Sequence, residues 1–230
     1  NDTEIMKIKV CGMREAQNIQ ELAELAIDYM GFIFFKRSKR HVAVFPEIAL
    51  PSRIKKVGVV VNESVDFLVD LIQKHELNGI QLHGGESSEF CQELKEVVTS
   101  SRVEKSQKDK TLKLPIARNK VDNNFVIIKA FSVDEHFDFS ITKDYESVCD
   151  LFIFDTKGKN YGGNGVKYDW SILQKYTGGT SFLLSGGITD NDVDLVKDFR
   201  HKKCIGVDLN SGFEDAPALK NIEKLKRFIK

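Results

Sequence analysis

Eight short apolar runs, separated by amphipathic stretches, constrain the fold of this chain more than any other feature. The runs are nearly continuously apolar and rich in Val, Ile and Phe, which is typical of strands buried on both faces. Strands of that kind usually pair in parallel. They are predicted at Met6–Val10, Tyr29–Phe35, Lys56–Val61, Gly79–Leu82, Phe125–Ala130, Asp150–Asp155, Phe182–Ser185 and Cys204–Leu209.

The stretches between the runs carry apolar residues at helical spacing. Helices are predicted at Glu15–Ala26, Ser64–His75, Glu89–Val98, Ile141–Val148, Trp170–Lys175, Asn191–Phe199 and Ala218–Ile229. Strand and helix alternating eight times in 230 residues predict an α/β fold, a single (β/α)8 TIM barrel, which needs roughly 250 residues on average. A doubly wound open sheet is the alternative, but Cys11-Gly12-Met13-Arg14 after the first run is not a G-x-G-x-x-G turn.

The composition limits the kinds of partner and the compartment that are expected for this chain. The 34 Lys and Arg residues balance the 34 Asp and Glu residues, so no net positive charge draws the chain to nucleic acid or to a membrane. No apolar run approaches the roughly 20 residues of a membrane helix, and the first residues lack the order of a signal peptide. Four cysteines without metal-ligand spacing fit reduced thiols. A cytoplasmic protein without a metal site is expected.

Two segments depart from the pattern of a single barrel domain over residues 1–230. Residues 1–5 precede the first apolar run and read as an extension or a cloning remnant. Residues 100–124 are highly charged and have little helical or strand period, so they are predicted to be an insertion before the fifth strand. The ordinary interpretation is a solvated loop, and the alternative is a role near a partner or the substrate.

Glycines follow the last two predicted strands, where a barrel commonly holds phosphate. Gly186 and Gly187 come after the seventh strand, and Ser211 and Gly212 after the eighth. Glycine lets backbone N–H groups approach an anion, and a following helix N-terminus adds a favourable dipole. A Gly-Gly pair can also be only a turn, but its place in two adjacent late loops favours a phosphate site and a sugar-phosphate ligand.

Polar residues end several other strands, which in a barrel places them at the catalytic end. Cys11, with Lys9 and Arg14 nearby, could be a small buried hydrophobe or a partly exposed thiol acting as a base. Asp155 ends an apolar run that would favour its protonated form, so it is either an acid or a loop cap. His83 could be a rim histidine, and Arg40 either part of a solvated basic loop or a fork for a carboxylate.

These residues stand in motifs that span nearly the whole chain and resemble the phosphoribosylanthranilate isomerase family of tryptophan biosynthesis. The matching stretches are Lys7 to Arg14, Gly31 to Phe34 with Ser38-Lys39-Arg40, Val57 to Asn62, Gln81 to Gly84, Phe154 to Lys157, Gly162 to Gly165 with Asp169-Trp170, Leu184 to Ile188 and Val207 to Glu214. The family commonly has Ser-Ser-Gly after the eighth strand, and here Asn210 takes the first position.

The resemblance implies a cofactor-free Amadori rearrangement of N-(5-phosphoribosyl)anthranilate to 1-(2-carboxyphenylamino)-1-deoxyribulose 5-phosphate. In this interpretation Asp155 is the acid that opens the ribose ring, Cys11 is the base and Arg40 binds the anthranilate carboxylate. Gly186, Gly187, Ser211 and Gly212 correspond to the phosphate site, and His83 and Asp208 line the substrate site.

Three alternatives remain open from the sequence: a pentose-phosphate epimerase, the next, indole-forming enzyme of the pathway, and a barrel that binds without catalysis. An epimerase usually needs a metal ligand set, which the spacing of His and Asp does not suggest. A monomer and a homodimer are equally compatible with the sequence.

Overall fold

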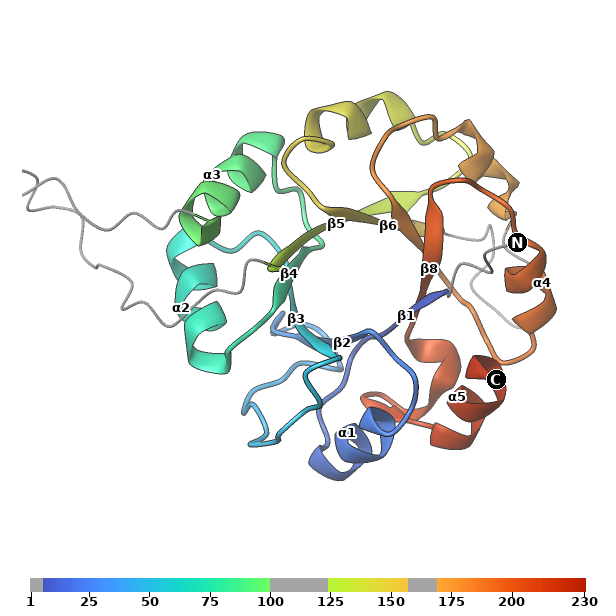
Figure 1. Cartoon of the computed structure of the whole chain (residues 1–230). Coiled ribbons are helices and arrows are strands. Elements are labelled where there is room, and N and C mark those ends of the chain that lie inside the picture. The colour runs from blue at the N-terminus through green and yellow to red at the C-terminus, as the bar shows by residue number, and fades with distance from the viewer. Residues whose placement is uncertain (1–5, 100–123, 157–168) are drawn as a thin grey trace, which may run out of the picture.

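Eight parallel strands form a closed barrel in the computed structural model, and helices surround it (Figure 1). The structure describes residues 6–99, 124–156 and 169–230. The expected extension at 1–5 and nearly all of the insertion at 100–124 lie outside these residues. The predicted (β/α)8 barrel is confirmed. Its strands are β1 (Lys7–Val10), β2 (Tyr29–Ile33), β3 (Lys55–Val60), β4 (Gly79–Leu82), β5 (Val126–Val133), β6 (Leu151–Thr156), β7 (Phe182–Ser185) and β8 (Cys204–Leu209).

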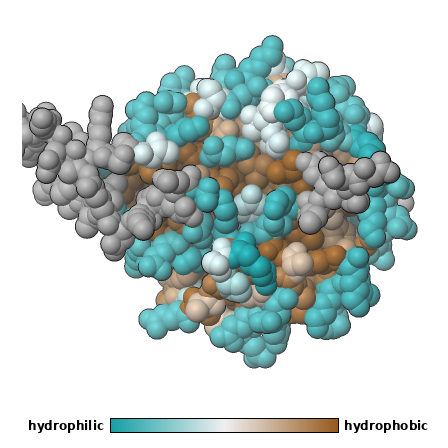
Figure 2. Space-filling view, in the orientation of Figure 1, coloured by the Kyte–Doolittle hydropathy of each residue, from teal (hydrophilic) through white to brown (hydrophobic). Residues whose placement is uncertain are grey.

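Each strand pairs with the next, and β1 closes the ring by pairing with β8 from Lys7↔Gly206 to Val10↔Leu209. Alternate side chains therefore point into the barrel and outward to the helices. The inward set forms a small apolar cluster that includes Val57, Ile153 and Leu183. The outward set packs against the helices in a larger cluster, and Figure 2 shows hydrophilic side chains over most of the outer rim.

Five α-helices and three 3-10 helices follow the strands in the described residues: α1 (Ala16–Ala23), α2 (Val65–His75), α3 (Ser88–Thr99), η1 (Phe139–Tyr145), η2 (Trp170–Lys175), α4 (Val193–Asp198), η3 (Ser211–Phe213) and α5 (Ile222–Ile229). The helix expected near residues 141–148 is instead η1. The Asp138 side chain accepts from the Ser140 N–H at 2.9 Å and Thr142 Oγ1 donates to the Phe139 carbonyl at 2.8 Å. Such local bonds compete with the α-helical ladder.

The helix expected at Ala218–Ile229 begins later than predicted. Ala218 has φ +67°, and Leu219–Lys220 form strand β10, which pairs with β9 (Glu214–Ala216) in a short antiparallel hairpin. The Asn221 side chain accepts from the Lys224 N–H at 2.9 Å and so caps α5, which starts at Ile222. The hairpin brings Glu214 and Lys220 to the end of the barrel where the strands terminate.

Candidate active site

The alternation of side chains along each strand explains which polar groups meet inside the barrel. Because Ile153 and Leu183 point inward, Asp155 and Ser185, two residues further along β6 and β7, point inward as well. Together with residues from the other strands they line one cavity of about 170 Å³. Its lining consists of Cys11, Ile33, Val59, Gln81, His83, Asp155, Ser185, Gly186, Gly187, Ile188, Asp208, Asn210, Ser211 and Gly212.

The structure thus brings together eight of the nine predicted site residues. Arg40 is the exception, since it does not line this cavity. Its guanidinium is bound to Glu214 of β9: Nε lies 2.8 Å and Nη2 2.6 Å from the carboxylate oxygens. The same carboxylate accepts from Lys220 Nζ at 2.6 Å, and this Nζ also donates to Asn210 Oδ1 at 3.1 Å. Arg40 therefore reaches the site as part of a buried charge network.

That network lies next to Cys11. A Cβ at Gly12, the following residue, would stand 2.6 Å from Arg40 Cδ, 2.8 Å from Asn210 Oδ1 and 3.4 Å from Lys220 Nζ. Gly12 also has φ +77°, which favours glycine. Any other residue here would displace Arg40 and Asn210 from the rim of the cavity.

The Cys11 thiol is buried at the end of β1, with only 4% of the residue exposed, so the expectation of a partly exposed thiol is wrong. The thiol packs against β2 so closely that a Cβ at Gly31 would lie 2.8 Å from Sγ. Burial raises the pKa of Cys11, and Asp208 adds to this, whereas the ammonium groups of Lys9 and Lys220 act to lower it. Cys11 is therefore a neutral thiol in the free protein near neutral pH.

Lys9 lies two residues before Cys11 on the same inward face of β1. Its side chain is fully buried, and Nζ donates to Asp208 Oδ1 at 2.7 Å. Asp208 in turn is 3.4 Å from Ser185 Oγ. Burial lowers the pKa of Lys9, but the charges of Asp208 and Cys11 outweigh it and hold that pKa above its ordinary value. A charged ammonium therefore stands beneath the thiol. Arg14, the other basic residue near Cys11 in sequence, pairs instead with Glu15 at 2.8 Å.

Asp155 and His83 face each other across the cavity, with Oδ2 and Nε2 3.9 Å apart. On its other side the imidazole Nδ1 is 3.3 Å from Gln81 Nε2. Desolvation lowers the pKa of His83, and the nearby Asp155 only partly opposes this. A neutral His83 that accepts from Gln81 at Nδ1 would present an Nε2–H to Asp155.

Two glycine loops close the cavity beside these groups. Gly186 and Gly187 have φ +104° and +61°, and a Cβ at Gly186 would collide with the Thr156 carbonyl. A Cβ at Gly212 would collide with the Ile188 carbonyl, so the loops after β7 and β8 are in backbone contact. Ser211 begins η3. No lysine or arginine lies in residues 185–189 or 210–213, so an anion here would be held by backbone N–H groups.

The loop after His83 is held by a third buried ion pair, between Lys129 and Glu86, that the sequence did not indicate. Glu86 accepts from the backbone N–H groups of Asn62 at 2.8 Å and Gly84 at 2.9 Å. Lys129 Nζ lies 3.4 Å from Glu86 and donates to the Gly84 carbonyl at 2.8 Å. These bonds fix the backbone that leads out of β4, and with it His83.

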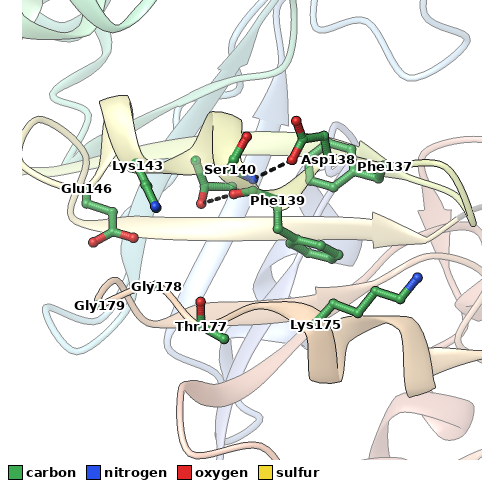
Figure 3. A pocket seen from close by; sticks show the side chains of 11 residues that line it. Phe137, Asp138, Phe139, Ser140, Lys143, Glu146, Lys175, Thr177, Gly178 and Gly179 are labelled. Atoms are coloured by element: carbon green, nitrogen blue, oxygen red, sulfur yellow. Dashed lines mark hydrogen bonds between the residues drawn. The ribbon is translucent and has the colours of Figure 1, made fainter.

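A larger hollow of about 580 Å³ lies on the outside of the barrel, between η1 and the loop before β7. Figure 3 shows Lys143 and Glu146 on one side of it and Lys175 and Thr177 on the other. Short 3-10 segments stand here in place of full helices, which leaves the groove. None of the residues at the C-terminal ends of the barrel strands line this hollow. The candidate active site is therefore the smaller cavity inside the barrel.

Some predicted features fall outside the described residues. Lys157 and the segment from Gly162 to Gly165 belong to residues 157–168, which lie outside the described ranges. Within the described ranges, no group of three or more His, Cys, Asp or Glu side chains could hold a metal ion. In the same ranges, no helix is long and apolar enough to cross a membrane.

The fold and the site define a class: a (β/α)8 barrel in which two glycine loops after β7 and β8 share one cavity with titratable groups at the ends of β1, β4, β6 and β8. Comparison with known proteins identifies the family within that class. Residues 8–123 and 115–230 match the family model of N-(5'phosphoribosyl)anthranilate (PRA) isomerase. The chain belongs to this family of isomerases of tryptophan biosynthesis.

Individual members of the family are similar to this chain over nearly its whole length. The chain is 43% identical to the N-(5'-phosphoribosyl)anthranilate isomerase of Parabacteroides distasonis, over 97% of this chain and 92% of the relative. Identity is 41% to that of Phocaeicola vulgatus, over 97% and 96%. The crystal structure of phosphoribosyl anthranilate isomerase from Thermotoga maritima superimposes with a TM-score of 0.74 at 28% identity, covering 98% of this chain and 97% of that one.

Proposed function

We propose that this chain converts N-(5-phosphoribosyl)anthranilate into 1-(2-carboxyphenylamino)-1-deoxyribulose 5-phosphate, with Asp155 as acid and Cys11 as base and with no cofactor. The observation that carries the proposal is the order of groups around the barrel. Asp155 is the last residue but one of β6 and Cys11 follows β1, and the two glycine loops lie between them, after β7 and β8. A ribose phosphate held by its phosphate at those loops would place its sugar carbons between acid and base.

The reaction needs one proton delivered and one removed. Asp155 donates a proton to the ring oxygen of the ribose; the bond from C1 to that oxygen breaks, and the nitrogen lone pair forms a C1=N double bond. Cys11 first loses its thiol proton to solvent; its thiolate then removes the proton from C2, the C–H electrons form a C1=C2 bond, and the C=N electrons return to nitrogen. The resulting enol gives its hydroxyl proton back to the Asp155 carboxylate and receives the Cys11 proton at C1, which gives the ketose and restores both groups. Atoms balance, because the substrate and the product are isomers.

Arg40 is proposed to bind the anthranilate carboxylate. Its bonds to Glu214 use Nε and Nη2, and Nη1 makes no hydrogen bond to another residue in the described part of the chain. The Nη1 side of the fork is therefore the side that can take a second carboxylate. A related solved structure is described as a complex with reduced 1-(o-carboxyphenylamino)-1-deoxyribulose 5-phosphate, a ligand that carries such a carboxylate.

His83 and Asp208 are proposed to line the substrate site rather than to carry the two proton transfers. A neutral His83 that donates Nε2–H toward Asp155 would orient the acid and could bond a sugar hydroxyl. Asp208 is already committed to Lys9 at 2.7 Å, so its free acceptor capacity is small. Gly186, Gly187, Ser211 and Gly212 are proposed to hold the phosphate.

The proposed activity is tested by generating phosphoribosylanthranilate in situ and following the loss of its anthranilate fluorescence. Cys11→Ala should abolish turnover and leave affinity for a product analogue within a few-fold, because the base acts on the transition state. Asp155→Asn should lower kcat in the same way. Removing Arg40 should weaken analogue binding by roughly 2–5 kcal/mol. Near-normal turnover in Cys11→Ala would refute the base.

We also infer a cytoplasmic location and leave the assembly as monomer or homodimer. Four free cysteines, three of them buried, support a reducing compartment. One solved structure of a relative is described as generated monomers of the dimeric phosphoribosylanthranilate isomerase from Thermotoga maritima. Sedimentation of the purified chain would decide the oligomeric state.

A further inference from the structure

We infer that the buried Lys9 ammonium, held beneath Cys11 inside the barrel, sets the acidity of the thiol and makes Lys9 a positioning residue for the proposed base. This inference rests on the proposed function, in which Cys11 removes a proton. It goes further by assigning a task to a residue that no step of the reaction uses directly.

The buried pair of Lys9 with Asp208 does not by itself explain why a cation stands at this depth. Its side chain is 0% exposed in the interior of the barrel, where most inward residues below the polar layer are apolar. Taking an ammonium out of water is costly, and replacing a buried ion pair by apolar residues is often neutral or stabilising. Lys9 and Cys11 stand two residues apart on one strand, so their side chains share one face. The structure therefore keeps a cation where it acts on the thiol.

Lys9 acts on the Cys11 thiol more strongly than the other charged groups around it, and it is also a hydrogen-bond partner of the thiol. Arg40, on the segment after β2, and Lys220, on β10, both face the thiol, but each is bound to Glu214, which offsets their charge. Across the cavity stand His83 and Asp155, whose side chains are 3.9 Å apart. The charged and titratable groups around the thiol, from every element packed against it, are Lys9, Arg40, His83, Asp155, Asp208, Glu214 and Lys220.

Lys9 and its partner Asp208 should act on the thiol in opposite directions. The ammonium stabilises the thiolate, and the carboxylate destabilises it. Replacing Lys9 removes the attraction and also leaves Asp208 uncompensated, so both changes raise the pKa of Cys11. Replacing Asp208 removes the carboxylate that repels the thiolate and neutralises Lys9, so the pKa of Cys11 falls. A residue with only a packing role would give no such difference in sign.

The test is the pH dependence of Cys11 alkylation by iodoacetamide, followed by mass spectrometry of the peptide that contains Cys11. The proteins are the wild type, Lys9→Met, Asp208→Asn and, as a matched control, Lys7→Met. Lys7 lies on the same strand and pairs with Asp28 at 2.7 Å, but its side chain is 47% exposed at the other end of the barrel. Because the readout is the midpoint and not the rate, a change in access to the buried thiol does not mimic the effect.

We expect the midpoint to rise by about one pH unit or more in Lys9→Met, to fall in Asp208→Asn and to stay unchanged in Lys7→Met. In turnover assays, the acid limb of the pH profile of kcat should move in the same direction as the midpoint of Cys11 alkylation, in each variant that remains active. Circular dichroism checks that each variant is folded.

An unchanged or lower midpoint in folded Lys9→Met would overturn the inference. If Lys9→Met does not fold, Asp208→Asn decides alone, and a midpoint equal to or above that of the wild type overturns it. Failure of the proposed function would look different: Cys11→Ala would then turn over substrate, whatever the midpoints are.

Discussion

Glu214 holds two cations at the rim of the site, and replacing it by glutamine should cost both stability and substrate affinity. The Lys220 side chain is 0% exposed and that of Glu214 is 6% exposed, so Glu214→Gln leaves an ammonium buried without its counter-charge. Breaking a buried pair in this way costs about 3–5 kcal/mol. Arg40, whose side chain is 22% exposed, adds less because water can reach it.

This loss is large enough to measure by thermal unfolding. For a chain of this size 1 kcal/mol shifts Tm by about 2–4 °C, so Glu214→Gln should melt about 6–20 °C below the wild type. The double variant Glu214→Gln with Lys220→Met removes the unpaired ammonium and should recover part of the loss. Glu223→Gln is the matched control, because its pair with Lys226 is exposed on α5 and its loss should leave Tm unchanged.

The same variant tests how Arg40 is oriented. Without the carboxylate, the guanidinium loses the bonds at 2.8 Å and 2.6 Å that fix its plane. We expect KM for phosphoribosylanthranilate to rise by about tenfold or more, equivalent to about 1.4 kcal/mol, with a smaller change in kcat. A Tm within about 2 °C of the wild type together with an unchanged KM would refute the reasoning, because Glu214 would then neither compensate Lys220 nor orient Arg40.

Three further expectations follow from the structure. Gly186→Ala should weaken inhibition by inorganic phosphate and lower the free energy of unfolding by about 1–3 kcal/mol, because φ at Gly186 is +104° and the new Cβ would meet the Thr156 carbonyl. Gly85→Ala is the control for both measurements, because its Cβ would stand 3.8 Å from Asn62 Oδ1. Burial raises the pKa of Glu214, but its bonds to Arg40 and Lys220 outweigh this effect and hold the pKa below its usual value. The ionised Glu214 therefore stabilises the folded state above the unfolded pKa of about 4.3, and this stabilisation is lost as pH falls through the folded pKa. The difference in unfolding free energy between wild type and Glu214→Gln should therefore narrow below about pH 4, and a constant difference in urea titrations would contradict it. Replacing residues 102–122 by a short Gly/Ser linker should leave kcat and KM nearly unchanged, because α3 ends at Thr99 and β5 begins at Val126, at the end of the barrel opposite the cavity; a tenfold loss of rate with intact circular dichroism would contradict it.

The strands and the inward residues at their ends could be predicted because both depend on local pattern. A run such as Leu151 to Phe154 is buried on both faces, so the strand can be located from composition alone. Once the barrel is inferred, the residue that ends each run falls at the catalytic end, which is why Cys11, His83, Asp155 and Asp208 were found together.

The partners of these residues could not be predicted, because they come from distant parts of the chain. Lys9 and Asp208 are 199 residues apart, and Arg40 and Glu214 are 174 apart. Glu214 stood in a motif, but nothing local shows that a short hairpin places it on an arginine. The hairpin itself, of three and two residues with an irregular register, is too short to show a strand period. The prediction that the Cys11 thiol is partly exposed was wrong for a related reason, because the burial of the thiol depends on its close contact with Gly31 of the neighbouring strand.

The arrangement of charges separates binding from proton transfer. The glycine loops after β7 and β8 carry no lysine or arginine in residues 185–189 and 210–213, so a phosphate held there, as proposed, would bring no extra cation to Asp155. The cations instead gather on the side of Cys11, where Arg40 and Lys220 share Glu214. In the proposed function, a substrate carboxylate on the remaining edge of Arg40 would cancel part of the positive charge near the thiol. Lys9, fully buried in the barrel, would then be the cation that still favours the thiolate.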